Sequence, residues 1–433
     1  MAVADAVCVA ALRGATLADV LAHRAAAAPD RRRVLLLEHS MTVAEALQVS
    51  NAQQGDAKQR AAADSHASCH QLLASHRVLS APLMVFPTLR PSLGEGLADD
   101  EPGSERPMYL GFLDVLDLLG GLLANLPPWV GVAPAVWRAA LAEATPRFMA
   151  RRLVTLPSRH DGDCVWSARA GAPLLDVLRG GFMASPGRAT HRVAVFDDHG
   201  DITAVVSQSD VVRFLAANAD EMLAGRLGDA SLQQLRLGGA RGALACAGAG
   251  APAVEALAAM RRLDVSALAV LSDDDGKLIG NLSASDLRGV VAASVEALAE
   301  PVQPLLRRLH QASVEGVDVH PFFQRAAAVS EEGDKAAKRH RRSRTPSPER
   351  SPRDAPRRRL EAERSPPPSV QAPPVLTATA ATPFRQAVAR LAAAGVHRVY
   401  VADERGRPSG VVTLTDVLRA VLEHAEASGQ GQA

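Results

Sequence analysis

Apolar and polar positions follow two alternating patterns over most of the chain. Stretches such as PLLDVLRGG, PAVEALAAMRRL and PFRQAVARLAAAG repeat apolar residues every three or four positions, which is typical of a helix with one apolar face. Two short apolar runs follow, joined by turns such as SDDDGK and DERGRP, and they predict a pair of strands. A second apolar helix comes next. The pattern therefore predicts a repeated helix–strand–strand–helix unit.

Two of the predicted units carry a histidine–arginine pair just before the first strand. The pairs are His191-Arg192 in THRVAVFDDHG and His397-Arg398 in GVHRVYVADERG. Both histidines lie 19 residues before the aspartate of a Ser/Thr-x-x-Asp element, in SQSDVVRFL and TLTDVLRAVL. The shared spacing indicates two copies of one unit rather than a chance match.

Two further units carry a serine–alanine pair in the corresponding place. Ser266-Ala267 precedes the element that ends at Asp286 in the third copy, and Ser80-Ala81 is expected to match it in the first copy. The alternation of Ser-Ala and His-Arg copies predicts two tandem pairs. Because the apolar face of a helix must be covered by another element, we expect the copies to pack against one another in pairs.

The start of each second helix offers groups that can bind a nucleotide. A hydroxyl at this position caps the helix, and the free N–H groups there attract an anion. The aspartate three residues later can accept hydrogen bonds from the two hydroxyls of a ribose. An arginine fork suits phosphate oxygens, and a histidine is partly protonated near neutral pH. Taken singly, such an element is usually only a cap and a His-Arg pair is usually only solvated; their joint recurrence predicts adenine-nucleotide binding.

Composition separates one basic segment from the rest of the chain. The 433 residues are 47% apolar and 3% aromatic, enough for two or three domains with cores of small aliphatic side chains. The formal net charge is +1, but residues 335–364 hold twelve Lys and Arg against four Asp and Glu. With almost no apolar residues, the surrounding segment 330–373 is predicted to be disordered. Its Ser-Pro and Thr-Pro pairs suit proline-directed kinases, and three interpretations stay open: a linker, nuclear import or weak RNA contact.

Other patterns point away from membranes, metals and catalysis. The four cysteines are scattered without a C-x-x-C pair, which indicates a reduced compartment, the cytoplasm or the nucleus. The apolar stretches are too broken by charged, glycine and proline residues to span a membrane. The motif HASCH at 66–70 resembles a metal site but has no second ligand cluster, so we expect no metal. We find no catalytic motif and do not expect an enzyme.

The fourth copy, GVHRVYVADERGRPSGVVTLTDVLRAVL, resembles the CBS (cystathionine β-synthase) domain family, and most closely the γ regulatory subunits of AMP-activated protein kinase. The second and third copies resemble the same family in its plant γ-like branch. The resemblance covers residues 30–297 and 374–425. It implies an α/β (α+β) fold of four CBS repeats, arranged as two tandem Bateman modules in a flat pseudo-symmetric disk with a disordered insertion.

These matches predict how the chain is divided. The segments are an N-terminal extension (1–30), CBS repeat 1 (31–125, with a loop insertion at about 88–107), repeat 2 (150–220), repeat 3 (228–297), a connecting segment (298–329), the basic insertion (330–373) and repeat 4 (374–425). Repeats 1 and 2 would form the first module, and repeats 3 and 4 the second.

The resemblance implies a non-catalytic regulatory subunit that binds AMP, ADP or ATP and regulates an energy-sensing Ser/Thr protein kinase complex. Its expected partners are the catalytic and scaffold subunits of that complex. The alternative is a CBS scaffold without nucleotide binding that acts through protein contacts and its phosphorylatable insertion. Carried over by position, the nucleotide-binding residues would be Thr190, His191, Arg192, Ser207, Asp210, Ser283, Asp286, His397, Arg398, Thr413, Asp416 and Asp117. In the first copy Asp114 stands where a hydroxyl is expected, and its carboxylate would repel a phosphate.

Overall fold

The structure is a computed structural model of the chain. It describes residues 2–27, 34, 36–47, 80–85, 107–127, 131–156, 167–184, 190–239, 244–286, 295–314 and 375–428. The motif at 66–70, the basic insertion at 330–373 and all of the loop insertion except residue 107 lie outside the described residues.

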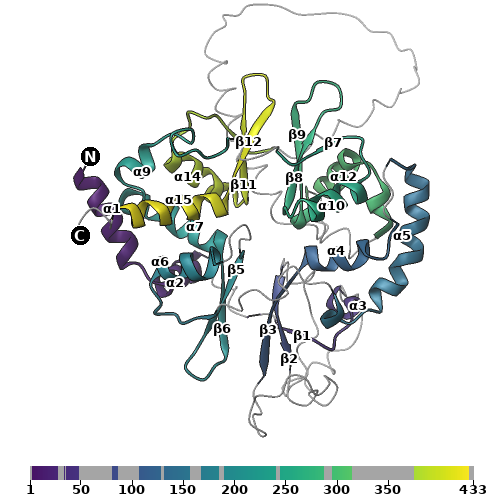
Figure 1. Cartoon of the computed structure of the whole chain (residues 1–433), viewed down its shortest axis with the longest axis horizontal. Coiled ribbons are helices and arrows are strands. Elements are labelled where there is room, and N and C mark those ends of the chain that lie inside the picture. Colours follow the sequence, from purple (N-terminus) through teal and green to yellow (C-terminus); the bar gives the residue numbers. More distant parts are fainter. Residues whose placement is uncertain are drawn as a thin grey trace, which may run out of the picture.

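Four three-stranded sheets share one topology. In each, a short first strand pairs in parallel with the central strand, which pairs antiparallel with the third strand. In copies 1 to 4 of the repeat the sheets are β1 (Leu37–Glu38), β2 (Ser80–Val85) and β3 (Met108–Asp114); β4 (Ser167–Ala168), β5 (Arg192–Phe196) and β6 (Ile202–Ser207); β7 (Cys246–Gly248), β8 (Ala267–Leu271) and β9 (Leu278–Ser283); and β10 (Thr377–Ala378), β11 (Arg398–Ala402) and β12 (Pro408–Thr413) (Figure 1). The strand pairs agree with the prediction. The short first strand of each sheet was not predicted, because two or three residues are too few to show an alternating pattern.

Helices flank every sheet. The first helices are α3 (Val43–Leu47), α6 (Leu174–Asp176) with the π-helical turn Val177–Phe182, α10 (Ala253–Arg262) and α14 (Phe384–Ala394). The second helices are α4 (Val115–Leu123), α7 (Gln208–Ala217) and α15 (Leu414–Ala427), and residues 284–286 are helical in copy 3. Further helices are α1 (Ala2–Gly14), α2 (Leu17–Ala27), α5 (Pro134–Met149), α8 (Ala219–Met222), α9 (Gly225–Asp229) and α12 (Val302–Val314). Within the described ranges, no helix combines the length and apolar character needed to cross a membrane.

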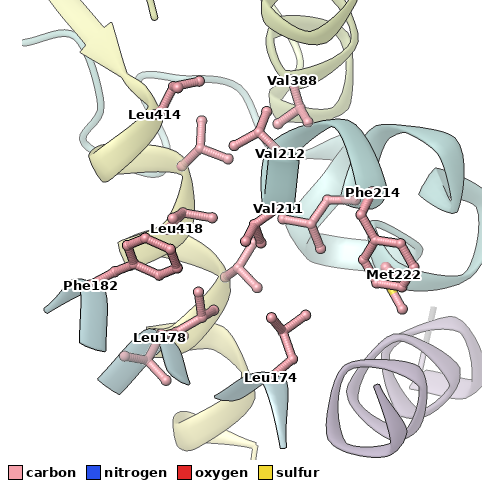
Figure 2. Close-up of a cluster of buried hydrophobic side chains, with 14 of the residues drawn as sticks. Leu174, Leu178, Phe182, Val211, Val212, Phe214, Met222, Val388, Leu414 and Leu418 are labelled. Carbon is pink, nitrogen blue, oxygen red and sulfur yellow. The ribbon is translucent and has the colours of Figure 1, made fainter. Parts of the chain in front are cut away.

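Helices from non-consecutive copies share two hydrophobic cores. One core joins copies 1 and 3 and packs α4 and α5 with α10 and α12. The other joins copies 2 and 4, where α7 contacts both α14 and α15 (Figure 1). Figure 2 shows Phe182, Val211 and Leu418 pointing toward one another in this second core. The apolar helix faces are thus covered by a copy two positions away along the chain.

The sheets of consecutive copies face each other instead. Between copies 1 and 2, the ring centroids of Tyr109 and Phe196 lie 5.7 Å apart. Between copies 3 and 4, the Tyr400 hydroxyl donates to Asn281 Oδ1 at 2.7 Å. The predicted tandem pairs are therefore modules joined through their sheets, and the helices join one module to the other.

The N-terminal helices belong to the core of copies 2 and 4. On α1, the Cys8 thiol donates to the Met222 carbonyl oxygen at 3.0 Å, and Arg13 Nη2 donates to the Ala425 carbonyl oxygen at 3.4 Å. Helix α2 packs against α7. The described part of the N-terminal extension is therefore part of the folded body.

Replacing Phe182 with alanine tests the shared core. The side chain is fully buried among residues of both copies 2 and 4. We expect Phe182→Ala to lower the free energy of unfolding by about 3–5 kcal/mol, because it removes buried apolar surface and leaves a cavity. Val3→Ala, at a side chain that is 79% exposed, should change it little. Urea denaturation measures both, and a loss under about 1 kcal/mol for Phe182→Ala would contradict this packing.

Candidate functional site

The second helices of copies 2 and 4 begin with the same reciprocal cap. Asp210 Oδ2 accepts from the Ser207 N–H at 2.9 Å and from its hydroxyl at 2.7 Å, and the Asp210 N–H lies 3.3 Å from Ser207 Oγ. Thr413 and Asp416 repeat these contacts at 2.9, 2.7 and 3.2 Å. The cap uses Oδ2 of each aspartate, so Oδ1 is the oxygen that can turn to other partners.

Copies 1 and 3 have more deeply buried caps. The Ser283 N–H and hydroxyl donate to Asp286 Oδ2 at 2.7 and 2.8 Å. In copy 1 the carboxylate of Asp114 takes the place of the hydroxyl: it accepts from the Asp117 N–H at 2.9 Å, and Asp117 Oδ2 accepts from the Asp114 N–H at 2.9 Å. Asp286 is 7% exposed and Asp117 is fully buried. Both aspartates are placed at helix starts as expected, but neither presents an open carboxylate.

Strand register places the arginine of each His-Arg pair directly opposite a helix cap. Arg192 pairs with Ser207, and Arg398 pairs with Thr413. Each arginine also reaches the facing copy: Arg192 Nη1 donates to the Ser80 carbonyl oxygen at 2.5 Å, and Arg398 Nη2 donates to a serine hydroxyl of copy 3 at 3.0 Å. The two guanidinium groups therefore lie inside their modules, between the paired sheets.

Copy 1 departs from the predicted alignment by one residue. In copy 1, Ser80 pairs with the cap residue Asp114. In copy 3, the residue that pairs with the cap is Ala267 and not Ser266, so Ser80 corresponds to Ala267. The expected match of Ser80-Ala81 to Ser266-Ala267 is therefore wrong by one position. The long insertion between the strands of copy 1 removes the constant spacing on which the alignment of the other copies depends.

The two His-Arg pairs meet where the starts of α7 and α15 adjoin. Thr415 Oγ1 donates to Gln208 Oε1 at 3.1 Å and so links the two helix starts. Four groups act electrostatically on His397 at this point: Arg398, His191, Arg192 and Arg213. We call these five residues the cationic centre. Charges from both modules converge there, beside two helix N-termini that carry partial positive charge of their own.

Burial and the neighbouring cations shift the pKa values of this centre. Burial, reinforced by the four groups around it, lowers the pKa of His397 to about 3. Burial also lowers the pKa of Arg398, against the attraction of Tyr400 and Asp286. This shift favours the neutral imidazole of His397 at pH 7, in contrast to the partial protonation expected from the sequence. An anion placed among these groups would favour the protonated form and raise that pKa.

The aspartates of the two His-Arg copies have different surroundings. Asp210 Oδ1 lies 3.5 Å from Arg213 Nη1, and its Oδ2 lies 3.7 Å from Arg24 Nη1 on α2. Asp416 Oδ1 lies 3.4 Å from Arg419 Nη1. The Asp210 side chain is 9% exposed, whereas that of Asp416 is 26% exposed. Copy 4 therefore offers the more accessible acceptor.

Several residues of the site are not among those predicted from the sequence. Arg213 and Arg419 each follow the aspartate by three residues, and the shared spelling of SDVVR and TDVLR is a signal that could have found them. Gln208 Nε2 donates to the carbonyl oxygen of Thr190 at 3.0 Å, so Thr190 is held through its backbone. Arg24 carries no local signal, because it comes from a segment far away in the sequence.

A cavity and the question of a metal site both bear on this centre. A cavity of about 630 Å³ lies at the start of α14 and the β11–β12 turn, where Thr379, Thr382, Gln386 and Asp403 are among its lining residues, and it includes none of the predicted nucleotide residues. In the part of the chain that the structure describes, no group of three or more His, Cys, Asp or Glu side chains could hold a metal. The site is thus defined by charge and hydrogen bonding.

Two stretches of the chain match the CBS domain family, residues 243–293 and 369–423. They contain the sheets of copies 3 and 4, and the sheets of copies 1 and 2 have the same topology. The predicted CBS fold, in two modules, is confirmed by this match and by the repeated sheets. A search of curated proteins finds no match.

The chain is also similar to solved structures at low sequence identity. One is protein MJ1225 from Methanocaldococcus jannaschii, described as a proposed archaeal homolog of g-AMPK, with 11% identity over 90% of this chain and 96% of that one and a TM-score of 0.47. Another is an uncharacterized conserved protein from Pyrococcus horikoshii, with 12% identity over 79% and 90% and a TM-score of 0.36. A third is the CBS domain of the bacterial CNNM/CorC family Mg²⁺ transporter, with 15% identity over 50% and 96% and a TM-score of 0.26.

The pKa of His397 predicts a pH dependence of stability. Its value of about 3 lies below the ordinary 6.5, so the unfolded chain binds the proton more readily between these values and stability falls as pH drops below 6.5. Between pH 7 and pH 5, we expect the protein to lose about 1–2 kcal/mol more than the variant His397→Gln. Urea denaturation at both pH values measures the difference.

The exposed Val3 provides a control. Val3→Ala should lose as much stability on acidification as the unmodified protein. Equal losses in the protein and in His397→Gln would show that the pKa of His397 is not depressed.

Proposed function

We propose that this CBS-domain protein is a regulatory subunit whose cationic centre binds the phosphates of an adenine nucleotide. The observation that carries the proposal is the convergence of Arg192, Arg213 and Arg398 with two histidines at the junction of the two modules. Like charges held together at a partly buried site repel one another, since their interaction is weakly screened there. A bound polyanion offsets that repulsion.

The surrounding groups suit phosphate in particular. Arginine binds two phosphate oxygens at once through its planar fork, and a charged pair of this kind is stronger than a neutral hydrogen bond. The starts of α7 and α15, joined through Gln208 and Thr415, add partial positive charge. A phosphate chain at this point would touch both modules at once.

Copy 4 is the copy best suited to hold the nucleoside. Asp416 Oδ2 is used by the cap, but Oδ1 has Arg419 alone at 3.4 Å among its ion-pair partners, and the side chain is 26% exposed. A carboxylate oxygen in this setting can accept from a ribose hydroxyl. The preference for adenine is inferred from the resemblance of this copy to the γ subunits. In copy 1, by contrast, the burial of Asp117 beneath Asp114 favours a structural role.

A ligand at the junction supports a regulatory role. It would bind best in one relative position of the modules, and a coupling of about 1–3 kcal/mol is enough for a useful allosteric response. By resemblance, the partner that receives this response is a Ser/Thr protein kinase complex, bound through its catalytic and scaffold subunits. The alternative, a CBS scaffold without nucleotide binding, makes the opposite prediction for the titration below.

Nucleotide titration tests the proposal. We expect the full chain to bind AMP, ADP or ATP, and Arg398→Ala to weaken binding about 10- to 150-fold, since a hydrogen bond to a charged group contributes about 1.5–3 kcal/mol. Arg405→Ala, at an exposed position on the β11–β12 turn, is the matched control and should bind normally. Isothermal titration calorimetry measures all three proteins.

Two outcomes would contradict the proposal in different ways. Absence of binding at millimolar nucleotide would favour the scaffold. Binding that is unchanged in both Arg398→Ala and Arg192→Ala, with the fold intact by circular dichroism, would place the nucleotide away from the cationic centre.

A further inference from the structure

An arginine of the N-terminal extension lies against the predicted ribose acceptor of copy 2. Arg24, near the end of α2, donates through Nη1 to the carbonyl oxygen of Val205 on β6. The same Nη1 lies 3.7 Å from Asp210 Oδ2, and the arginine side chain is 23% exposed. One guanidinium thus contacts the third strand of copy 2 and the carboxylate at the start of its second helix.

The docking of α2 fixes this position. Just before α2, the chain pairs with the start of copy 2: the Leu17 N–H donates to the Ala172 carbonyl oxygen at 2.9 Å, and the Leu174 N–H donates to the Ala15 carbonyl oxygen at 2.8 Å. Along α2, the ring of His23 packs edge to face against the ring of Phe214 on α7, with the centroids 6.0 Å apart. The backbone and the apolar side of α2 are therefore anchored, and Arg24 is held over the first turn of α7.

Comparison of the copies singles out copy 2. In copies 2, 3 and 4, a short backbone bridge ties the start of the first helix to another segment, at Thr16 for copy 2, Pro301 for copy 3 and Ser231 for copy 4. Arg24 lies eight residues after the bridge residue of copy 2. The residue eight positions after the bridge is Leu309 in copy 3 and Gly239 in copy 4. In these three copies, the positively charged side chain at this place belongs to copy 2.

The contacts of Asp210 leave little for a ligand. Oδ2 accepts from the N–H and the hydroxyl of Ser207 and faces Arg24, while Oδ1 faces Arg213 at 3.5 Å. The side chain is 9% exposed, compared with 26% for Asp416 in copy 4. Arg24 therefore lies beside the carboxylate that a ribose would have to reach, and a backbone carbonyl holds it there.

We propose that Arg24 is an intramolecular plug that closes the nucleoside site of copy 2, so that the N-terminal extension determines which His-Arg copy takes a nucleotide. This inference rests on the proposed nucleotide binding at the cationic centre. Copy 4, with its more accessible aspartate, stays open. Arg24 acts here by occupying the ribose side of the site, not by binding phosphate.

The number of nucleotides bound per chain tests the plug. Equilibrium dialysis of the full chain with AMP compares the unmodified protein with Arg24→Met, which keeps the apolar stem of the side chain but removes its donors. We expect Arg24→Met to bind one additional AMP per chain. Arg13→Met, on α1 and away from Asp210, is the matched control and should leave the number unchanged. Adding Asp210→Asn to Arg24→Met should abolish the additional site.

A second measurement does not depend on Arg24→Met and so remains valid if that variant loosens the N-terminal extension. Asp416→Asn in the unmodified protein should lower the number of bound AMP by one, because copy 4 carries the open site. An unchanged or reduced number in Arg24→Met, with the fold intact, would overturn the plug. If the unmodified protein binds no AMP but Arg24→Met binds one, the plug stands and the proposed site in copy 4 fails; if neither binds, both proposals fail.

Discussion

The rest of the structure depends on the apolar core that copies 2 and 4 share, because its burial is the main stabilising contribution. This core holds α7, which carries Arg213, close to the segment between α14 and β11 that carries His397, so that positive charges converge where the two copies meet. Arg192, Arg213 and Arg398 repel one another at this partly buried point, and the burial of the core offsets that repulsion. Burial is the main cause of the depressed pKa of His397, and the neighbouring cations add to it.

The arrangement of the four copies explains how such a centre can regulate. Facing sheets join copies within a module, and shared helix cores join the modules to each other. Arg192 belongs to the first module and Arg398 to the second, so an anion between them would contact both. The same arrangement places the N-terminal extension on copy 2, where Arg24 meets Asp210. The cationic centre and the N-terminal extension therefore meet at the same helix start.

Local patterns in the sequence are enough to predict the helix caps and the strand pairing of the site. The caps at Ser207 and Thr413 could be predicted because a cap involves residues only three positions apart. The pairing of Arg192 and Arg398 with those caps follows from a constant spacing of strands. The alignment of Ser80 failed by one residue, because a long insertion interrupts that spacing in copy 1.

Features that arise from packing could not be predicted in this way. The depressed pKa of His397 depends on burial and on cations from three separate segments, and the contact of Arg24 with Asp210 joins residues far apart in the sequence. The crossed pairing of helices, copy 1 with 3 and copy 2 with 4, has no signature in a single amphipathic pattern, because such a pattern shows which face is buried but not what covers it.

Comparing adenosine with AMP tests most directly whether the cationic centre exists to hold phosphate. The two molecules share the base and the ribose, and only AMP carries the group that the arginines would bind. Calorimetric titration of the full chain at low ionic strength should show AMP binding at least about 10-fold more tightly than adenosine, as expected for even one charge-assisted contact. Equal affinity for the two ligands would contradict the account.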